Sequence, residues 1–455
     1  MSSKKIVMPC LLITCLILFM AQNAGAGKGW EEEQKQMFSQ LPVKPGDVID
    51  NSNWEKVKDL LPEPVVNWVK RGEWEIKVGQ MEFDYDYNPK WYELSAQNKD
   101  KYTLGSRKEI IDVKTGKFPM FVRGLPFPDA DVKNDPEGAT KLMHNNNICL
   151  MMNNNFYTHG EPKQGLIQWI GAGGHERGVG MAMKRFYYWN RNGGEIPNPN
   201  EYMHTTGVIT TWPYDLAGTC TLYYRHLDGR DDTLYAYVPA IRRVKRLSGA
   251  NRSDPQMGSD STMDDGDGWS GQVEAMTWKY LGDKVMLVPK LEADAKSPQV
   301  AKMINGVWDL DNSTGSLAGY ETPGWTRAPW AYTNFVWVPR EVWIVEAVPK
   351  DPFYTYGRMI LHVDKQSLIN NYSLKYSRAG EYWKAMVNAV PQGYIPDPSY
   401  APTDKVFNWN GPFCILDERT HHATNLPQKE NHKIVNSPNI EPRNFTPEAL
   451  RTWTK

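Results

Sequence analysis

Apolar and polar residues alternate through residues 220–290 in the way that is typical of antiparallel β-strands. The dipeptide Asp228-Gly229 is a strong signal for a two-residue hairpin turn, because both residues tolerate positive φ angles. This turn places Arg225 opposite Asp232, a favourable cross-strand pair of opposite charges. The predicted register has two further facing pairs: Tyr224 with Thr233, and Leu222 with Tyr235.

A second hairpin is predicted at Gly282-Asp283, with Tyr280 facing Val285 and Trp278 facing Leu287. The two hairpins together would present one largely apolar face. Its predicted members are Leu222, Tyr224, Tyr235, Tyr237, Met276, Trp278, Tyr280, Val285 and Leu287. A sheet must cover such a face. The cover is either an ordinary protein core or a bound hydrophobic ligand, and the sequence leaves both readings open.

The rest of the chain predicts further strands and a few helices. Strands are expected at residues 73–83, 342–346, 358–363 and 368–376, with a hairpin at 110–121. Helices are expected at 30–41, 54–61, 135–143 and 379–390, with a last one capped at Thr446. The overall prediction is an α+β protein: a large antiparallel sheet at 166–390, a helical and hairpin region at 27–165, and a proline-rich extension at 391–455.

The beginning of the chain has the pattern of a secretory signal peptide. Lys4 and Lys5 precede an apolar run at residues 6–20, and Ala24-Gly25-Ala26 follows as a small-residue cleavage site. The alternative, a retained membrane anchor, is disfavoured because the run is short for a membrane span. Cleavage is therefore expected after Ala26, with the mature protein soluble in the periplasm.

Composition narrows the range of partners. The formal net charge of −1 gives no sign of a nucleic-acid partner. Three cysteines remain after the predicted cleavage: Cys149, Cys220 and Cys414. At most one disulfide can form among them, and the sequence does not show whether it does. The 18 Trp and 23 Tyr residues suit broad sheets and apolar ligands.

The usual motifs of catalytic and metal sites are missing from the sequence. It contains no His-Glu-x-x-His, Cys-x-x-Cys, Gly-x-Ser-x-Gly or phosphate-loop lysine motif. His421-His422 has no metal-ligand partner at a suitable spacing, so a surface loop is expected. The chain is therefore predicted to be no enzyme, with no cofactor and no bound metal.

Two charged segments have alternative readings. Residues 254–268 are acidic and rich in glycine, and the carboxylates of Asp260, Asp264, Asp265 and Asp267 could bind calcium. Their spacing misses the EF-hand pattern, so a mobile solvated loop is expected. A basic strand follows the first hairpin and contains Arg242, Arg243, Lys245 and Arg246. It could contact anionic head groups or an acidic partner, or it could be a charged edge that blocks aggregation.

Several segments together resemble a known family. They are Gly46-Asp47-Val48-Ile49, Asn53-Trp54-Glu55-Lys56, Leu61-Pro62, Gly124-Leu125-Pro126-Phe127-Pro128, the run from Tyr235 to Val244, Val345-Glu346-Ala347, Asp364, and the run from Asn444 to Leu450. The family is bacterial, of unknown function, and described as outer-membrane lipoprotein-sorting-like periplasmic proteins. The resemblance covers nearly the whole mature chain.

The resemblance implies a LolA/LolB-type fold, an incomplete antiparallel barrel whose concave apolar face holds acyl chains under a helical lid. The large antiparallel sheet is therefore expected to be curved, with helices on its concave side. The resemblance also implies an association with exporters of the resistance-nodulation-division (RND) type, and it supplies no catalytic residues. The expected function is the carriage of a lipid or other hydrophobic molecule, with an exporter or outer-membrane protein as partner. Two alternatives remain: a structural adaptor of an envelope complex, and a periplasmic enzyme of a new type.

Overall fold

The computed structural model describes residues 29–85, 87, 89–149, 154–160, 167–311, 315–396, 407–408, 411–427 and 431–453. The predicted signal peptide lies outside these residues. Among the described residues, no helix has the length and apolar character needed to cross a bilayer.

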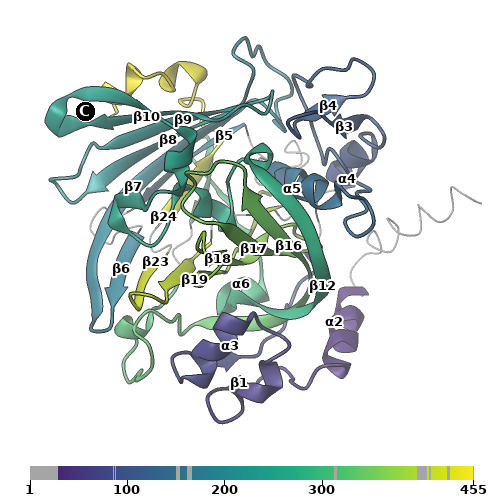
Figure 1. The fold of residues 1–455 in the computed structure, drawn as a ribbon, viewed down its shortest axis with the longest axis vertical. Helices are drawn as coiled ribbons and strands as arrows, with labels where there is room; N and C mark the ends of the chain where they lie inside the picture. The colour runs from purple at the N-terminus through teal and green to yellow at the C-terminus, as the bar shows by residue number, and fades with distance from the viewer. Residues whose placement is uncertain are drawn as a thin grey trace, which may run out of the picture.

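One large antiparallel sheet dominates the molecule and curves round a central space (Figure 1). In spatial order its strands are β12 (Met276–Leu291), β16 (Phe335–Pro349), β17 (Arg358–Asp364), β18 (Asn370–Tyr376), β19 (Tyr382–Asn388), β22 (Phe413–Asp417), β23 (His422–Leu426), β6 (Ile167–Gly171), β7 (Gly174–Tyr187), β8 (Tyr202–Trp212), β9 (Cys220–His226), β10 (Thr233–Val238) and β11 (Arg243–Leu247). Within the described part of the chain, the end strands β12 and β11 do not pair with each other. The predicted incomplete antiparallel barrel is therefore confirmed.

A branch of four strands lies beside the second half of β7. It consists of β5 (Asn155–Gly160), β24 (Asn431–Val435), β15 (Val307–Asp311) and β14 (Lys302–Ile304). Three small sheets lie outside the large one. They pair β1 (Val48–Ile49) with β2 (Ile76–Lys77), β3 (Tyr102–Leu104) with β4 (Ile110–Asp112), and β20 (Gln392–Tyr394) with β13 (Gln299–Val300) and β21 (Phe407–Asn408).

The first predicted hairpin is confirmed in its register. Tyr224 pairs with Thr233 and Leu222 pairs with Tyr235 across β9 and β10. Gly229 takes the positive φ of 69° that the turn requires.

The second predicted hairpin is wrong. β12 continues straight through Gly282-Asp283 as one strand of 16 residues and pairs with β16 along its length. The ladder shifts register between Tyr280 and Gly282, so the glycine marks a β-bulge. Glycine suits a bulge as well as a turn, and alternating residues suit one long strand as well as two short ones.

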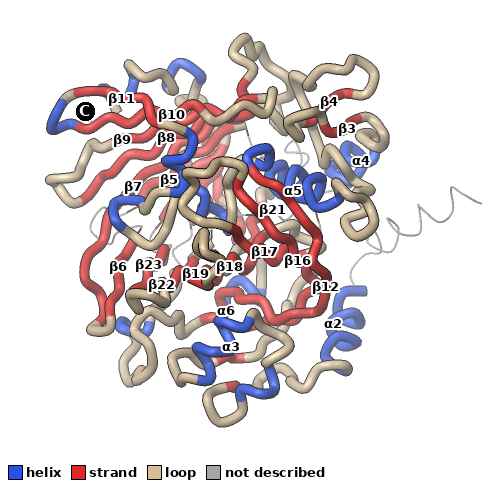
Figure 2. Tube along the Cα trace, in the orientation of Figure 1, coloured by secondary structure: helices blue, strands red, loops and turns tan. Residues whose placement is uncertain are grey.

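The helices are short, and they flank the sheet (Figure 2). They are α2 (Gly29–Ser39), α3 (Glu63–Lys70), α4 (Pro89–Ala96), α5 (Gly138–Cys149) and α6 (Glu292–Lys296), together with single 3-10 turns such as η1 (Trp54–Val57) and η10 (Ala449–Arg451). α2, α5 and the last turn after Thr446 agree with the predicted helices, and Thr446 Oγ1 accepts a hydrogen bond from the Ala449 N–H at 3.1 Å.

Other local predictions need correction. The segment predicted as a helix at 379–390 contains β19, because pairing with β18 and β22 overrides its helical propensity. The helix predicted at 54–61 is only the single turn η1. The strand predicted at 73–83 is reduced to β2, and the predicted hairpin at 110–121 is replaced by pairing of β4 with β3. Residues 413–435, predicted as part of a proline-rich extension, supply three strands to the large sheet.

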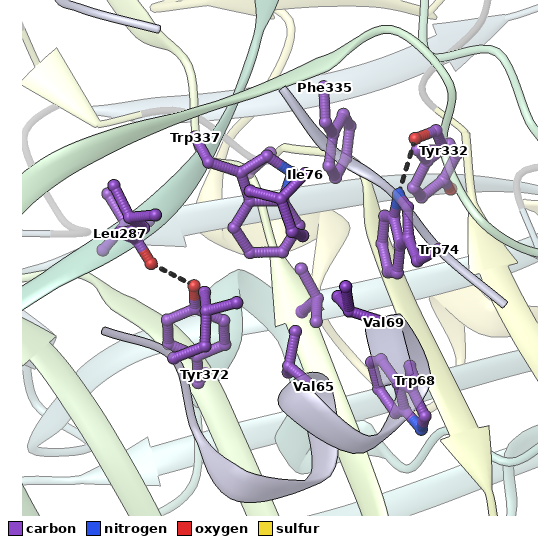
Figure 3. Close-up of a cluster of buried hydrophobic side chains, with 14 of the residues drawn as sticks. Val65, Trp68, Val69, Trp74, Ile76, Leu287, Tyr332, Phe335, Trp337 and Tyr372 are labelled. Carbon is purple, nitrogen blue, oxygen red and sulfur yellow. Dashed lines mark hydrogen bonds between the residues drawn. The ribbon is translucent and has the colours of Figure 1, made fainter. Parts of the chain in front are cut away.

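A core rich in tryptophan lies between α3 and the sheet (Figure 3). α3 supplies Val65, Trp68 and Val69 to it, and the sheet supplies Trp337 and Tyr372. Trp74 lies between them, and its indole N–H donates to the Tyr332 carbonyl oxygen at 3.0 Å. α3 thus packs on the sheet through this core, and the expected placement of the helices on the concave side is not confirmed.

α5 lies near the rim of the sheet beside β12 (Figure 1). Its Leu142 and Met143 belong to a core that includes Trp278 and Met359. Register places Trp278, Ala347, Met359 and Lys375 on one face, the concave one. The asparagines of this helix are buried and tie down loops; Asn145, for example, donates to the Phe127 carbonyl oxygen at 2.7 Å and accepts from its N–H at 3.1 Å.

Candidate functional site

The concave side of the sheet is filled by residues 249–275, here called the inner segment. It is a chain of 3-10 turns: η4 (Gly249–Ser253), η5 (Gln256–Gly258), η6 (Met263–Gly268) and η7 (Val273–Ala275). The segment contacts side chains of β6, β7, β9, β18, β19 and β23 at once. Only a segment enclosed by the curved sheet can reach strands so far apart in the sheet order.

Asp260, Asp264 and Asp265 of the inner segment are buried and face cations. Asp265 pairs with Lys375 of β18, and Asp260 lies 3.8 Å from Lys384 of β19. Asp260 also accepts hydrogen bonds from Thr424 Oγ1 at 2.9 Å, and it lies 2.8 Å from Nδ1 of His422. The expected mobile solvated loop is therefore wrong. The carboxylates are used in ion pairs with side chains that lie far away in the sequence.

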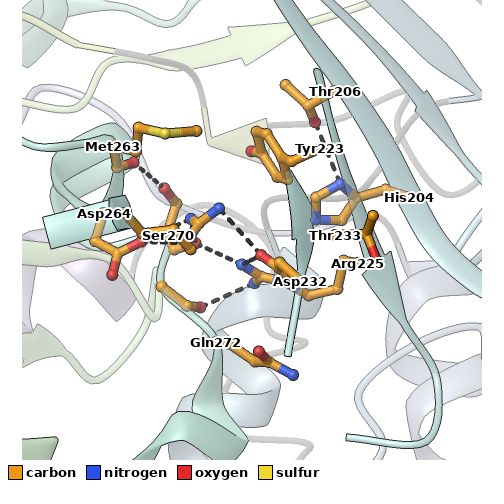
Figure 4. A network of polar contacts seen from close by, with 12 residues as sticks. His204, Thr206, Tyr223, Arg225, Asp232, Thr233, Met263, Asp264, Ser270 and Gln272 are labelled. Atoms are coloured by element: carbon orange, nitrogen blue, oxygen red, sulfur yellow. Dashed lines mark hydrogen bonds and ion pairs between the residues drawn. The ribbon is translucent and has the colours of Figure 1, made fainter. Parts of the chain in front are cut away.

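A second group of charges joins the inner segment to the first hairpin (Figure 4). Asp232 Oδ2 lies 2.9 Å from Arg225 and 3.0 Å from Arg252, and its side chain is completely buried. Arg252 continues to Asp264 at 2.6 Å. The carbonyl oxygens of Ser270 and Gly271 accept hydrogen bonds from Arg225 at 3.1 and 2.9 Å. The predicted pair of Arg225 with Asp232 is confirmed, now as part of a four-membered chain.

A cavity of about 100 Å³ remains between the inner segment and the sheet. One wall is apolar and comes from β6, β7, β8, β22 and β23. It is lined by Ile167, Met181, Met183, Val208, Phe413 and Leu426. The opposite wall is polar and comes from the inner segment, with Asp267, Thr262 and Ser270 among its residues. The cavity is therefore amphipathic.

Arg185 of β7 is the cation at this cavity. Its Nε donates to Thr206 Oγ1 at 2.8 Å and its Nη2 to the Tyr223 hydroxyl at 3.1 Å. The remaining nitrogen, Nη1, lies 4.0 Å from Asp267 Oδ2, a longer distance than in the Arg225–Asp232 and Arg252–Asp264 pairs. The side chains of Arg185 and Asp267 are 7% and 8% exposed.

The surroundings of Arg185 are electropositive. Burial raises the pKa of Tyr223, but the guanidinium groups of Arg185, Arg252 and Arg225 outweigh burial and bring this pKa below its ordinary value. Burial and the same three cations hold the pKa of His204 far below its usual range, so this imidazole is neutral. An anion placed in the cavity would be stabilised by this field.

Eight of the nine residues predicted to form one apolar face are distributed over three cores, and Val285 belongs to none of them. Leu222, Tyr224 and Tyr237 are buried, and Tyr235 is partly buried, against residues 440–453 near the end of the chain. The Tyr224 hydroxyl donates to the Phe445 carbonyl oxygen at 2.9 Å. This face of β9 and β10 is opposite to the face that carries Tyr223 and Arg225, since neighbouring residues of a strand point to opposite sides.

The β12 members of the set share one face of the strand, because all five pair with alternate residues of β16 from Pro349 to Pro339. They differ in position along the strand. Met276 and Trp278 are buried in the core beside α5, and the Trp278 indole N–H donates to the Val273 carbonyl oxygen of the inner segment at 2.9 Å. Tyr280 and Val285 are half-buried, whereas Leu287 is buried in the tryptophan-rich core that contains α3. The structure therefore does not bring the nine residues together, and their role in ligand binding stays a prediction.

The basic residues lie on β11, the strand at one end of the sheet. Arg243, Lys245 and Arg246 are exposed on it, and Arg242 directly precedes it with a positive φ of 50°. Among the described residues, β11 pairs only with β10. These side chains are thus free to meet an anionic surface, and they equally protect an exposed strand edge.

The remaining candidate groups are accounted for by local contacts. The thiols of Cys149, Cys220 and Cys414 are free and buried, so none of them forms a disulfide. His421 is exposed beside Glu73, at 3.2 Å, while His422 is held by Asp260 and Glu176. The side-chain hydrogen bond to Asp260 raises the pKa of His422 above its ordinary value.

Sequence reasoning missed Arg185 and the inner segment's position. Arg185 stands among ordinary strand residues, and its partners Thr206, Tyr223 and Asp267 are distant along the chain. The sequence shows the cluster of carboxylates at 260–267. It does not show that they are buried, because most of the lysines and arginines that pair with them lie far away along the chain.

Comparison with solved structures finds distant relatives. An outer-membrane lipoprotein-sorting protein domain from Vibrio parahaemolyticus is 17% identical, with a TM-score of 0.43, over 70% of this chain and 100% of that one. A DUF1329 family protein from Desulfovibrio piger is 14% identical, with a TM-score of 0.42 and the same coverage. A LolA superfamily protein from Nitrosomonas europaea is 10% identical, with a TM-score of 0.32, over 64% of this chain and 89% of that one.

These scores are low, so the fold assignment rests on the strand pairings described above. A search of curated proteins found no match. The family resemblance expected from the sequence is confirmed by a family model described as "Protein of unknown function (DUF1329)", which matches residues 48–451. The chain belongs to the DUF1329 family.

Proposed function

We propose that this protein is a periplasmic carrier for a lipid or other hydrophobic molecule, which it shields on the concave side of the sheet without making or breaking bonds. One observation carries the proposal: the concave side is filled by a separate segment fastened through ion pairs. A purely structural core would be expected to be apolar, because buried ion pairs stabilise a fold weakly compared with hydrophobic packing.

In this proposal the inner segment occupies the cargo site of the unloaded protein. The cavity of about 100 Å³ is smaller than the roughly 300–1,000 Å³ of typical ligand pockets, so a complete lipid needs the segment to move. Apolar surface that the cargo buries against the sheet would contribute about 25 cal/mol per Å². That gain must exceed the free energy lost when the segment's ion pairs open.

Two further features support the carrier model in different ways. The exposed basic strand β11 could contact anionic head groups or an acidic partner during transfer, and an RND-type exporter or an outer-membrane protein would be the partner. The predicted signal peptide, with cleavage after Ala26, supports export. The alternative of an adaptor in an envelope complex predicts that the inner segment never leaves the concave side.

The test is native mass spectrometry of the mature chain, isolated gently from a periplasmic fraction, followed by organic extraction and lipid analysis. The carrier model expects a co-purifying hydrophobic molecule at up to one per chain. An apo mass that persists after incubation with membrane extract would refute carriage and favour the adaptor. Turnover of the added lipid would point instead to an enzyme.

A further inference from the structure

The cavity beside Arg185 joins a buried cation to an apolar wall. The Arg185 side chain is only 7% exposed. Thr206 and Tyr223 hold two of its nitrogens, and the guanidinium also has a hydrogen bond with the Tyr187 side chain. Its third nitrogen faces Asp267 across the cavity wall. A guanidinium group fixed in this way presents a ready site for a carboxylate oxygen.

Asp267 has the properties of a replaceable partner. Its 4.0 Å separation from Arg185 is too long for a hydrogen bond, whereas the Arg225–Asp232 and Arg252–Asp264 contacts are 2.9 and 2.6 Å. Its backbone has a positive φ of 54°, a sparsely populated conformation for a residue other than glycine. Such conformations are held by their surroundings and are common at ligand clamps.

The charge balance near the cavity also favours an anion. Lys433 is a second buried basic group near Asp267 and Arg185, with its Nζ 4.1 Å from the centre of the Phe156 ring; burial lowers its pKa to about 7, so it is only partly protonated at neutral pH. Asp267 is the carboxylate that interacts with both basic groups. The apolar wall on the other side is formed partly by Met181 and Met183, whose flexible side chains adapt to ligands of different shape.

We propose that this cavity binds the carboxylate head group of a long-chain amphiphile, and that Asp267 takes the place of that carboxylate at Arg185 in the unloaded protein. The inference rests on the proposed carrier function and specifies the chemical class of its cargo. The head group displaces Asp267 from Arg185, and the alkyl chain follows the apolar wall as the inner segment moves away. The cavity volume suits the head group alone, which explains why loading and movement of the segment are coupled.

The test measures binding of oleate and of oleyl alcohol to the delipidated mature protein, by native mass spectrometry and calorimetry below micellar concentrations. The two probes share the alkyl chain and differ in the head group. Oleate should bind about tenfold more tightly or better, the size of one charge-assisted hydrogen bond. Asp267→Asn should raise the affinity for oleate several-fold and leave oleyl alcohol unchanged, because it removes the competing carboxylate.

Arg185→Gln should abolish the preference for oleate. Lys184→Gln is the matched control, since Lys184 is the neighbouring residue of β7 and its side chain contacts Trp453 on the outer face. It should bind both probes as the wild type does. If Arg185→Gln fails to fold, Asp267→Asn still decides, because a gain in affinity cannot come from misfolding.

Equal binding of oleate and oleyl alcohol, with no effect of Asp267→Asn, would overturn the head-group inference and leave the carrier function standing. Saturation by butyrate at the same concentration as oleate would identify a site for small free anions and would also overturn it. Failure of both long-chain probes to bind, in a protein that yields no lipid on extraction, would overturn the carrier function itself.

Discussion

Buried charges in this protein share partners. Asp232 forms ion pairs with both Arg225 and Arg252, and Arg252 also pairs with Asp264. Burial raises the pKa of Asp232, but the two guanidinium groups outweigh burial and bring it below the ordinary value. Removing one charged side chain therefore leaves more than one buried neighbour without an opposite charge. The resulting loss of stability exceeds that from breaking an isolated ion pair.

Asp232→Asn should destabilise the protein by about 3–5 kcal/mol, because two buried guanidinium groups lose their shared carboxylate. Asp228→Asn is the matched control in the turn of the same hairpin. Asp228 contacts Arg230 and Arg107 at partly exposed positions, so its loss should change stability by less than about 1 kcal/mol. Urea unfolding of both variants compares the two; equal effects would contradict the shared-carboxylate interpretation.

Glu274 gives the stability a measurable pH dependence. Burial raises the pKa of this carboxyl from 4.5 to about 7, despite opposing interactions with its backbone and with Arg225. The folded state therefore holds a proton that the unfolded state releases between these two pH values. The resulting stabilisation is complete below pH 4.5 and is lost as the pH rises through 7.

Glu274→Gln removes this titration. The variant should match the wild type at about pH 4.5 and exceed its unfolding free energy by on the order of 2–3 kcal/mol at pH 8. Urea unfolding at several pH values measures the difference in unfolding free energy between the variant and the wild type. The contributions of all other titrating groups cancel in this difference, because both proteins contain them. A difference that does not vary with pH would show that Glu274 is already ionised in the folded state.

Residue-level contacts were predictable where the partners are close in sequence. Arg225 and Asp232 are seven positions apart across a recognisable turn, and their pairing is correct. Asp265 and Lys375 are 110 positions apart, and Asp264 and the Tyr354 hydroxyl 90. No local pattern links such residues, so the carboxylates of the inner segment looked like a solvated loop.

At the level of elements, local sequence patterns predict which segments are strands better than they predict where one strand ends and the next begins. β12 was correctly expected to be extended, but Gly282 was assigned to a turn when it forms a bulge. β19 was assigned to a helix because its Tyr-Trp-Lys-Ala-Met-Val sequence fits either structure, and its neighbours in the sheet decide the outcome. The predicted antiparallel sheet follows from repeated alternation and needs none of these details, whereas its curvature is what the family resemblance implies.

The inner segment offers a direct test of its own displacement. Ser253 Oγ at the end of η4 lies 3.1 Å from Thr355 Oγ1, which belongs to the connection between β16 and β17. Replacing both residues with cysteine should allow a disulfide, since its sulfur atoms need only a small further approach. The oxidised double variant should fail to take up hydrophobic cargo, and reduction should restore uptake.

Each single cysteine variant serves as the control and should load normally under oxidising conditions. The three native thiols are buried and should not interfere, because reactive thiols need access to solvent. Undiminished loading of the cross-linked protein would show that this end of the inner segment stays in place while cargo binds.

At the scale of the whole molecule, the outer face of β8 to β10 is covered by residues 440–453. Gly207 of β8 lies directly beneath the Trp453 ring, and a Cβ added at Gly207 would come within 2.0 Å of that ring. Gly207→Ala should therefore displace the tryptophan and destabilise the protein by about 1–3 kcal/mol.

A double-mutant cycle with Trp453→Ala tests this contact. In the Trp453→Ala background the Gly207→Ala substitution should lose most of its effect, because the obstructing ring is gone. Additive effects of the two substitutions, measured by urea unfolding, would show that the cost of Gly207→Ala arises elsewhere in β8.

The position of β22 and β23 between β19 and β6 has a consequence for biogenesis. Strands β5 and β6 are made early, yet their partners β24 and β23 are the last strands of the sheet to be synthesised. Until residues 413–435 have left the ribosome, the nascent chain carries unpaired strand edges, which are prone to aggregate. Strands β6 to β11 and β16 to β19 can pair in sequence as they emerge, but the two halves of the sheet can be joined only at the end of synthesis, so a chaperone that shields the waiting edges would determine the yield.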